Sequence, residues 1–299
     1  MTTEIRPVKK LLGLLACLLL LPAWAHAQAG GGADLNISPK RLVFSGASRS
    51  AVVYVFNRGT ESASYSIEFV DRVMLPDGQI VAVAEATTNA DAPASIAALK
   101  SAKEMLNFTP RRVTLGPGES QIIRVRLLAP AGLAAGEYRS HMTVSTLPSE
   151  DVGVTAEQLA NVNDGQLAVK VVSLLSLSIP VIVRQEVGAG KPALAQLAVA
   201  PNPGHASDQP AAFLTLSLLR SGAGSVYGNI EVLAQKAGGK AEAVGGIKGV
   251  AVYPEIDHRA VQVPLGREVH AGEHLMVRFV EDDEGGKANV LADASLDVR

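Results

Sequence analysis

The sequence predicts an all-β protein with two β-sandwich domains. Short segments that alternate apolar and polar residues recur through most of the chain, and this period of two is typical of strands with one buried face. Gly, Pro, Asn and Asp cluster between these segments, where turns are needed. The 299 residues suffice for two domains of ordinary size. We find no fixed repeat that would indicate a helical array.

The first 29 residues have the pattern of a secretory signal peptide. Three basic residues precede an uninterrupted apolar run at 11–21, and small residues follow, so cleavage after Ala27 or Ala29 fits the pattern. The run is shorter than the ~20 residues that a membrane-spanning helix needs. We therefore expect residues 1–29 to be removed and the mature protein to be exported without membrane insertion.

The cysteine and charge counts of the mature chain limit how it is stabilised and what it binds. The only cysteine, Cys17, lies in the predicted signal peptide, so the mature domains are expected to depend on their hydrophobic cores alone. Removing three basic residues and Glu4 turns 27 basic and 29 acidic residues into 24 and 28, a net charge of −4. This balance does not favour nucleic acid or an anionic membrane as a partner.

The expected first domain, residues 30–184, contains the clearest alternation. We predict strands at 50–56, 64–70, 79–83, 108–115, 121–127 and 136–144. Residues 75–78, Leu-Pro-Asp-Gly, predict a hairpin turn, because Pro presets φ and Gly accepts a positive φ. Residues 94–106 break the alternation and predict a short amphipathic helix, and the polar stretch 148–164 predicts a mobile loop.

The segment 166–184 predicts one unusually long strand. Its odd positions form a nearly continuous apolar face, made by Leu167, Val169, Val171, Ser173, Leu175, Leu177, Ile179, Val181 and Val183. Pro180 cannot donate a ladder hydrogen bond, and prolines inside sheets are confined to edges or bulges. We therefore expect this strand at a sheet edge. Because exposed apolar edges promote aggregation, another molecule should normally cover it.

A Gly-rich stretch at 185–192 predicts a linker to a second domain at 193–299. In this second domain we predict strands at 213–219, 226–233, 249–253, 260–265, 274–280 and 290–298. Their alternation is weaker than in the first domain. A second β-sandwich is the expected architecture.

Several of these segments together resemble the PapD-like periplasmic pilus chaperones. The matching segments are 38–44 (SPKRLVF), 57–59 (NRG), 115–126 (LGPGESQIIRVR) and 179–184 (IPVIVR), with a weaker match at 279–286 (FVEDDEGG). The resemblance implies two immunoglobulin-like β-sandwich domains in an L or boomerang arrangement. It also implies a periplasmic chaperone that stabilises pilus or fimbrial subunits and delivers them for assembly. Whether an outer-membrane usher is a further partner stays open.

The resemblance gives the long edge strand a function. In this family the last strand of the first domain completes a subunit that lacks its own final strand, with main-chain hydrogen bonds giving affinity and side chains filling the open core. Strand 166–184 would be the donor strand. Its donated side chains would be Leu167, Val169, Val171, Leu175, Leu177 and Ile179.

The resemblance also implies roles for charged residues. Arg41 matches the arginine that anchors the subunit's terminal carboxylate, whereas Pro180 stands where the family has a partner lysine. Glu137, Arg184 and Asp282 match a trio that fixes the angle between the domains by ion pairing. Asp283 could replace Asp282 under a shift of one residue.

No group of residues indicates an enzyme or a metal site. His270 and His274 are four residues apart, but metal-binding histidines at this spacing need a helix, and Gly272 between them favours a turn. The acidic residues 281–284 fit a solvated hairpin end better than a calcium site. We expect no catalysis and no cofactor.

A second hypothesis is an exported structural or adhesive immunoglobulin-like component of a surface assembly. Its edge strand would pair with its own kind or dock in the assembly. The two hypotheses differ in the fate of the protein, because a chaperone stays soluble in 1:1 complexes and a structural component appears in sheared surface fibres.

Overall fold

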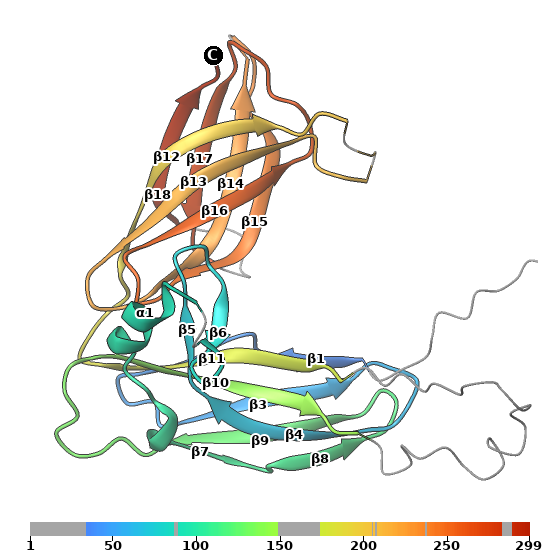
Figure 1. The fold of residues 1–299 in the computed structure, drawn as a ribbon, viewed down its shortest axis with the longest axis vertical. Coiled ribbons are helices and arrows are strands. Elements are labelled where there is room, and N and C mark those ends of the chain that lie inside the picture. The colour runs from blue at the N-terminus through green and yellow to red at the C-terminus, as the bar shows by residue number, and fades with distance from the viewer. Residues whose placement is uncertain are drawn as a thin grey trace, which may run out of the picture. The chain divides into compact units, whose positions relative to one another are not determined.

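The computed structural model describes residues 34–86, 89–148, 174–204, 206, 208–236, 238–282 and 289–299. Strands make up nearly all of the regular structure in these residues, which confirms the predicted all-β fold (Figure 1). The predicted signal peptide lies outside the described residues, as do most of the polar stretch 148–164 and the donor positions Leu167, Val169 and Val171.

The first half of the chain forms a sandwich of two sheets, which we call the first sandwich. One sheet has the strand order β1-β3-β9-β7 and the other β2-β11-β10-β4-β8. The strands are β1 (Leu35–Ser38), β2 (Leu42–Ser45), β3 (Ser50–Asn57), β4 (Ala63–Val70), β7 (Leu106–Thr109), β8 (Arg112–Leu115), β9 (Ser120–Leu127), β10 (Gly136–Thr146) and β11 (Ser176–Gln185). Alternate residues of both sheets meet in one core, as in Val53 and Val125 of the first sheet and Val144 and Val181 of the second, each 0% exposed.

The chain changes sheets between β1 and β2. β1 pairs antiparallel with β3 in one sheet, whereas β2 pairs parallel with β11 in the other, with Leu42 opposite Val181. Arg41 is the residue just before β2, so the crossover brings it beside the start of the β2–β11 ladder.

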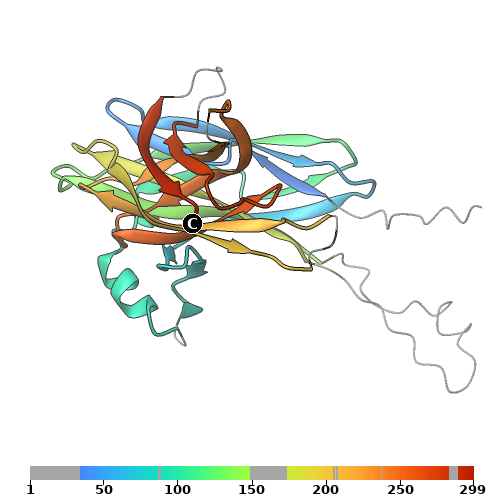
Figure 2. The same ribbon diagram turned by 90° about the horizontal axis from the view of Figure 1, so that it is seen from above.

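An insertion between β4 and β7 carries the hairpin of β5 (Arg72–Met74) and β6 (Ile80–Ala82) and the helix α1 (Ala92–Ala98). The predicted turn is confirmed, with a 2.9 Å bond from Leu75 N to Gln79 O and a φ of 88° at Gly78. The predicted helix 94–106 is too long, because Leu99 is extended with a ψ of 124° and only a 3₁₀ turn, Lys103–Met105, follows before β7. Figure 2 shows α1, in teal, beside the sheets.

The second half forms the second sandwich from seven antiparallel strands in the order β12-β13-β16-β15-β14-β17-β18. They are β12 (Lys191–Pro201), β13 (Ala212–Ser221), β14 (Val226–Gln235), β15 (Glu242–Val252), β16 (His258–Leu265), β17 (His274–Val280) and β18 (Val290–Asp297). Because β15 and β16 share only the pair Gly245 and Leu265, the sheet divides into two layers (Figure 1). All six predicted strands are present, whereas β12, which begins inside the predicted linker, was not foreseen.

The β5–β6 hairpin joins the two sandwiches. Ala260 N donates to Pro76 O at 2.9 Å, and Met74 N donates to the Glu255 carboxylate at 2.9 Å. Met74 and Ile182, from the first half, are buried in the hydrophobic core of the second sandwich. We call the contacts of residues 72–78, 137–141 and 182–184 with residues 225–227 and 253–260 the junction.

None of the helices in the described part of the chain is long and apolar enough to cross a membrane.

The turn at Asn57 is the best single test of the first sandwich. Asn57 is fully buried; its amide donates to Glu61 O at 2.6 Å and Leu115 O at 3.1 Å, and its oxygen accepts from Gly59 N at 3.0 Å. We expect Asn57→Ala to lower the free energy of unfolding by about 2 to 3 kcal/mol, because several buried polar groups lose their partner.

Urea unfolding would measure this loss. The exposed neighbour Arg58 gives the control, and Arg58→Ala should stay within about 0.5 kcal/mol of the wild type. Equal losses in both variants would contradict the role of the Asn57 side chain.

Candidate functional site

β11 is paired on one side along its length and on the other side only in part. β10 covers it from Ser176 to Gln185, whereas β2 covers only Val181 to Arg184. Among the described residues, 176–180 therefore have one free edge. The edge position predicted from Pro180 holds for this stretch, and Pro180 lies just before the β2 ladder begins.

The apolar face of β11 starts inside the first sandwich. Ile179, Val181 and Val183 are 4%, 0% and 2% exposed and belong to the sandwich's own core, and Leu177 packs against that core. This corrects the expectation that Ile179 is donated, because its side chain is already buried in the core of the first sandwich. The alternating pattern shows that Ile179 is buried, but it does not show whether it is buried in the first sandwich or in a bound subunit.

Toward the N-terminal end of β11, the same face becomes exposed to solvent. Leu175 is 48% exposed, and its carbonyl still accepts a 2.8 Å bond from Thr146 N, so the strand geometry extends to it. By alternation Leu175 lies on the side of Leu177. Leu174, on the opposite side, is 55% exposed. A core face thus continues into solvent at the end of β11.

Arg41 is a half-buried cation beside the second sandwich. Its guanidinium carbon lies 4.3 Å from the centre of the Tyr227 ring, in β14. Its Nε is buried without a hydrogen-bond partner, and no described residue accepts a hydrogen bond from the rest of the guanidinium. Burial lowers the pKa of Arg41, and the charge of Arg184 lowers it further. A half-buried cation whose donors have no bonded acceptor is suited to bind an anion.

Pro180 of β11 stands where the expected lysine would lie beside Arg41, and the basic residue of β11 whose charge reaches Arg41, Arg184, is bonded to Glu137. One step along the register from the pair Leu42 and Val181, Arg41 lies next to Pro180, and Pro180 is opposite His141 of β10. His141 is 3% exposed. Of the three neighbouring residues Arg41, Pro180 and His141, only Arg41 is therefore an accessible cation.

Two members of the predicted ionic trio are paired. Arg184 Nε donates to Glu137 Oε2 at 2.9 Å across the β10–β11 ladder. Ser225 N donates to the same oxygen at 2.9 Å, and Arg184 donates to Ser225 O at 3.2 Å. This group joins β10 and β11 to the residue that precedes β14.

Asp282 is not the third member, which corrects the sequence expectation. It accepts a 3.0 Å hydrogen bond from Asn229. The pKa of Tyr227 is raised mainly by the burial of that tyrosine, and the charge of Asp282 raises it further. Ser225 takes the expected place through its backbone N–H. The alternative Asp283 lies outside the described residues.

Sequence reasoning missed a second buried ion pair at the junction. The side chains of Arg139 of β10 and of Glu255, which precedes β16, are each 2% exposed and bonded to each other. The Arg139 guanidinium also lies 3.8 Å from the centre of the Tyr253 ring and donates to Arg72 O at 3.1 Å. Burial raises the pKa of Glu255, and the charge of Arg139 opposes that shift. No sequence signal links two residues that are 116 positions apart.

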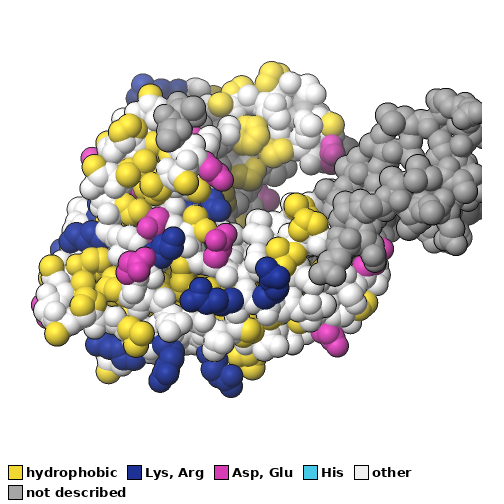
Figure 3. Space-filling view, turned by 60° about the horizontal axis from the view of Figure 1, so that its bottom comes forward, with side chains coloured by type: hydrophobic (Ala, Val, Ile, Leu, Met, Phe, Trp, Pro, Cys, Tyr) yellow, Lys and Arg dark blue, Asp and Glu magenta, His cyan; other side chains and the backbone are white. Residues whose placement is uncertain are grey.

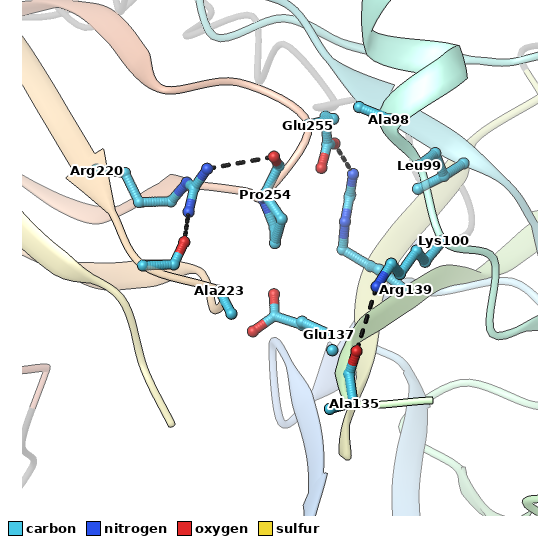
Figure 4. A pocket seen from close by; sticks show the side chains of 12 residues that line it. Ala98, Leu99, Lys100, Ala135, Glu137, Arg139, Arg220, Ala223, Pro254 and Glu255 are labelled. Carbon is cyan, nitrogen blue, oxygen red and sulfur yellow. Dashed lines mark hydrogen bonds and ion pairs between the residues drawn. The ribbon is translucent and has the colours of Figure 1, made fainter. Parts of the chain in front are cut away.

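A cavity of about 250 Å³ lies against this ion pair (Figure 4). Arg220 on its wall donates to Pro254 O at 3.2 Å and Ile256 O at 3.0 Å, and Lys100 donates to Ala135 O at 3.3 Å. The Glu137 carboxylate points toward the middle of the view in Figure 4, but it is bonded to Arg184 and Ser225. Of the polar groups that line the cavity, Glu137 and Glu255 bond across the junction, whereas the bonds of Arg220 and Lys100 each stay within one sandwich.

The described residues contain no group of three or more His, Cys, Asp or Glu placed to hold a metal ion. His274 lies in β17 and contacts Asp297 at 2.6 Å, and Gly272 has a φ of 87° in the turn before it. The expectation of a turn between His270 and His274 is therefore confirmed.

One face of the described surface carries side chains of both charge signs (Figure 3). On the face drawn in Figure 3, acidic and basic side chains are interspersed with hydrophobic ones. This distribution agrees with the nearly balanced composition of 27 basic and 29 acidic residues.

Comparisons with known proteins find similarity among solved structures. No family model and no curated protein matches the sequence. The chain is similar to the E. coli chaperone DraB, with 13% identity, a TM-score of 0.43, and coverage of 89% of this chain and 97% of that one. It is similar to the Pseudomonas aeruginosa CupB2 chaperone, with 11% identity, a TM-score of 0.40, and coverage of 87% and 100%.

A third similar structure is the CsuC–CsuE chaperone–tip adhesion subunit pre-assembly complex from the archaic chaperone-usher Csu pili of Acinetobacter baumannii. There the identity is 15%, the TM-score is 0.42, and the match covers 89% of this chain and 99% of that one. The chain thus spans nearly the whole length of all three.

The charges at the junction predict unequal mutational effects. We expect Glu137→Ala to lower the free energy of unfolding by about 3 kcal/mol, because it leaves Arg184 and the Ser225 N–H without their shared acceptor. Asp282→Ala is the matched control and should cost less than about 1 kcal/mol. Urea unfolding would compare the two, and equal costs would restore Asp282 to the trio.

Proposed function

We propose that the mature protein is a periplasmic chaperone that binds pilus or fimbrial subunits, lends them the edge of β11 and delivers them for assembly. The observation that supports this most is the strand itself. Residues 176–180 have a free edge, and the core face of β11 continues to the exposed Leu175. A strand of the subunit that pairs with this edge would extend the first sandwich's sheet.

Side chains of the donor strand would fill the open core of the subunit. Leu175 is the described residue best placed for this, and Leu167, Val169 and Val171 continue the same alternation in the sequence. Leu177 lies at the boundary, since it is partly buried against the chaperone's own core. Ile179 is left out because it is 4% exposed. The two cores would then be continuous along one strand.

Arg41 would anchor the subunit's terminal carboxylate. A guanidinium presents two parallel N–H donors that match a carboxylate, and the Tyr227 ring at 4.3 Å supports the cation from one side. The Glu137–Arg184–Ser225 group lies on the neighbouring strands and fixes the second sandwich against β11. Arg41 itself has no hydrogen-bonded acceptor among the described residues, so its guanidinium donors would be free to bind the carboxylate.

The location and further partners belong to the same proposal. The predicted signal peptide directs the chain to the periplasm, and the cysteine-free mature sequence needs no oxidative folding there. Binding requires no cofactor and no chemical step. An outer-membrane usher is included as a later partner on the resemblance alone.

Leu175→Asp tests strand donation. A charge at this position would have to be buried in the subunit, so we expect the variant to lose co-purification with a co-expressed pilin-like subunit. Its own unfolding should change by no more than about 0.5 kcal/mol, since the site is exposed.

Leu128→Asp is the matched control, because Leu128 is 62% exposed after β9 and away from β11. Capture should persist in this variant. Normal capture by Leu175→Asp would remove the basis of the proposal, and recovery of the protein in sheared surface fibres would favour a structural component.

Arg41→Ala tests carboxylate anchoring. Loss of charge-assisted hydrogen bonds worth about 1.5 to 3 kcal/mol should weaken subunit binding roughly 10- to 100-fold, while the melting temperature changes little. Binding titrations would compare it with Lys40→Ala, an exposed neighbour bonded to Asn36. If both variants bind alike, Arg41 is not the anchor.

A further inference from the structure

His141 of β10 is a buried histidine in direct contact with an arginine. It is 3% exposed, and its Nε2 lies 3.3 Å from Nη1 of Arg139. A guanidinium has only donors, so Nε2 must accept and the ring must be neutral with its proton on Nδ1. Nδ1 is buried without a hydrogen-bond partner. The geometry therefore requires the uncharged form of His141.

The groups around His141 offer little compensation for a positive charge. Arg139 on its own strand and Arg72 on β5 are cations, while Val70 of β4 and Pro180 of β11 lie opposite it in the two ladders. From the second sandwich, the Tyr253 ring lies edge-on at 6.5 Å. Glu255 is the carboxylate of this group, and it is already bonded to Arg139 and to Met74 N.

We propose that His141 makes the junction between the two sandwiches acid-sensitive, because protonation of its ring loosens the contacts of Arg139 with Glu255 and Tyr253. This inference stands apart from strand donation and would hold for any function of the chain. The protonated ring can no longer accept from Arg139. Two adjacent cations would then compete for one buried carboxylate.

The direction of the pH effect follows from the pKa. Burial, and then the charges of Arg139 and Arg72, hold the pKa of His141 well below its usual value of 6.5. The open junction, where the ring meets water, binds a proton more readily than the closed one. The closed junction is therefore fully stable above about pH 6.5 and loses stability as the pH falls below that value.

The same opening would reach the anion site. Arg41 contacts Tyr227 of the second sandwich, and the junction holds that sandwich in place. Acid would thus loosen the support of Arg41 as well as the contacts of Arg139.

Hydrogen exchange on the mature wild-type protein tests the inference. The amides of Met74 and Ala260 report on the junction, because they donate to Glu255 and Pro76 across it. Amides of Val53 and Val125 report on the core of the first sandwich. After correction for intrinsic rates, the junction amides should open up to roughly 25-fold more at pH 5 than at pH 7. The core amides should change much less.

Two variants assign the effect to one ring. His141→Gln keeps a neutral acceptor for Arg139 and should abolish the acceleration, whereas His258→Gln, at a histidine with a half-exposed side chain, should retain it. Acceleration that survives His141→Gln overturns the inference, as does equal junction protection at both pH values in the wild type.

If His141→Gln does not fold, a titration of the wild-type histidine rings by NMR decides instead. A His141 ring that titrates near pH 6.5 without a change in junction exchange contradicts the inference. A depressed pKa together with acid-enhanced exchange at Met74 and Ala260 supports it.

Discussion

The register of β11 is the constraint on which the rest of the structure depends. Its odd residues Ile179, Val181 and Val183 fill the core of the first sandwich, while Ile182 on the other side is buried in the core of the second. Arg184 continues that second side with its ion pair to Glu137. A slip of one residue would exchange the two sides and disrupt both cores and the junction together.

The junction buries several charged side chains, and removing these charges from water is unfavourable unless they are paired and hydrogen-bonded. A buried ion pair stabilises a protein only when its remaining polar atoms are also satisfied. Glu137 and Glu255 each accept from an arginine and from a backbone N–H, at Ser225 and Met74. Arg41 and Arg72 lie outside these pairs, and the Nε of each is buried without a hydrogen-bond partner, while Arg41 lies against the Tyr227 ring.

Alternation predicted most strands because the two sandwiches bury one face of each. β12 was missed, since its sequence KPALAQLAVAP is rich in Ala, carries proline near both ends and contains a register shift between Ala195 and Ala198. The α1 boundary was misjudged because the insertion packs against its own small apolar cluster, with Ala92 buried before the predicted helix start. Local pattern cannot show how a tertiary contact ends an element.

The errors at the site have a common cause. Sequence pattern reveals that Ile179 is buried but not in which core, and it identifies the charge of Asp282 but not the backbone N–H of Ser225 that Glu137 uses instead. Arg139 alternates like a solvent-facing residue, although Glu255 from a distant loop covers it. Pairings between distant residues depend on the packing of two domains, which no local window contains.

The free edge of β11 is limited in length and in apolar character. Opposite its apolar face, Ser176 and Ser178 are bonded to Ser145 and Thr143 of β10 at 2.8 Å each, so that side is covered with hydroxyl groups. At Pro180 the open stretch ends, where β2 takes over the pairing. Within β11 itself, one short edge is therefore left to attract another chain, and the exposed Leu174 and Leu175 lie just before it. An edge confined in this way lowers the risk of uncontrolled sheet growth and still leaves room for one added strand.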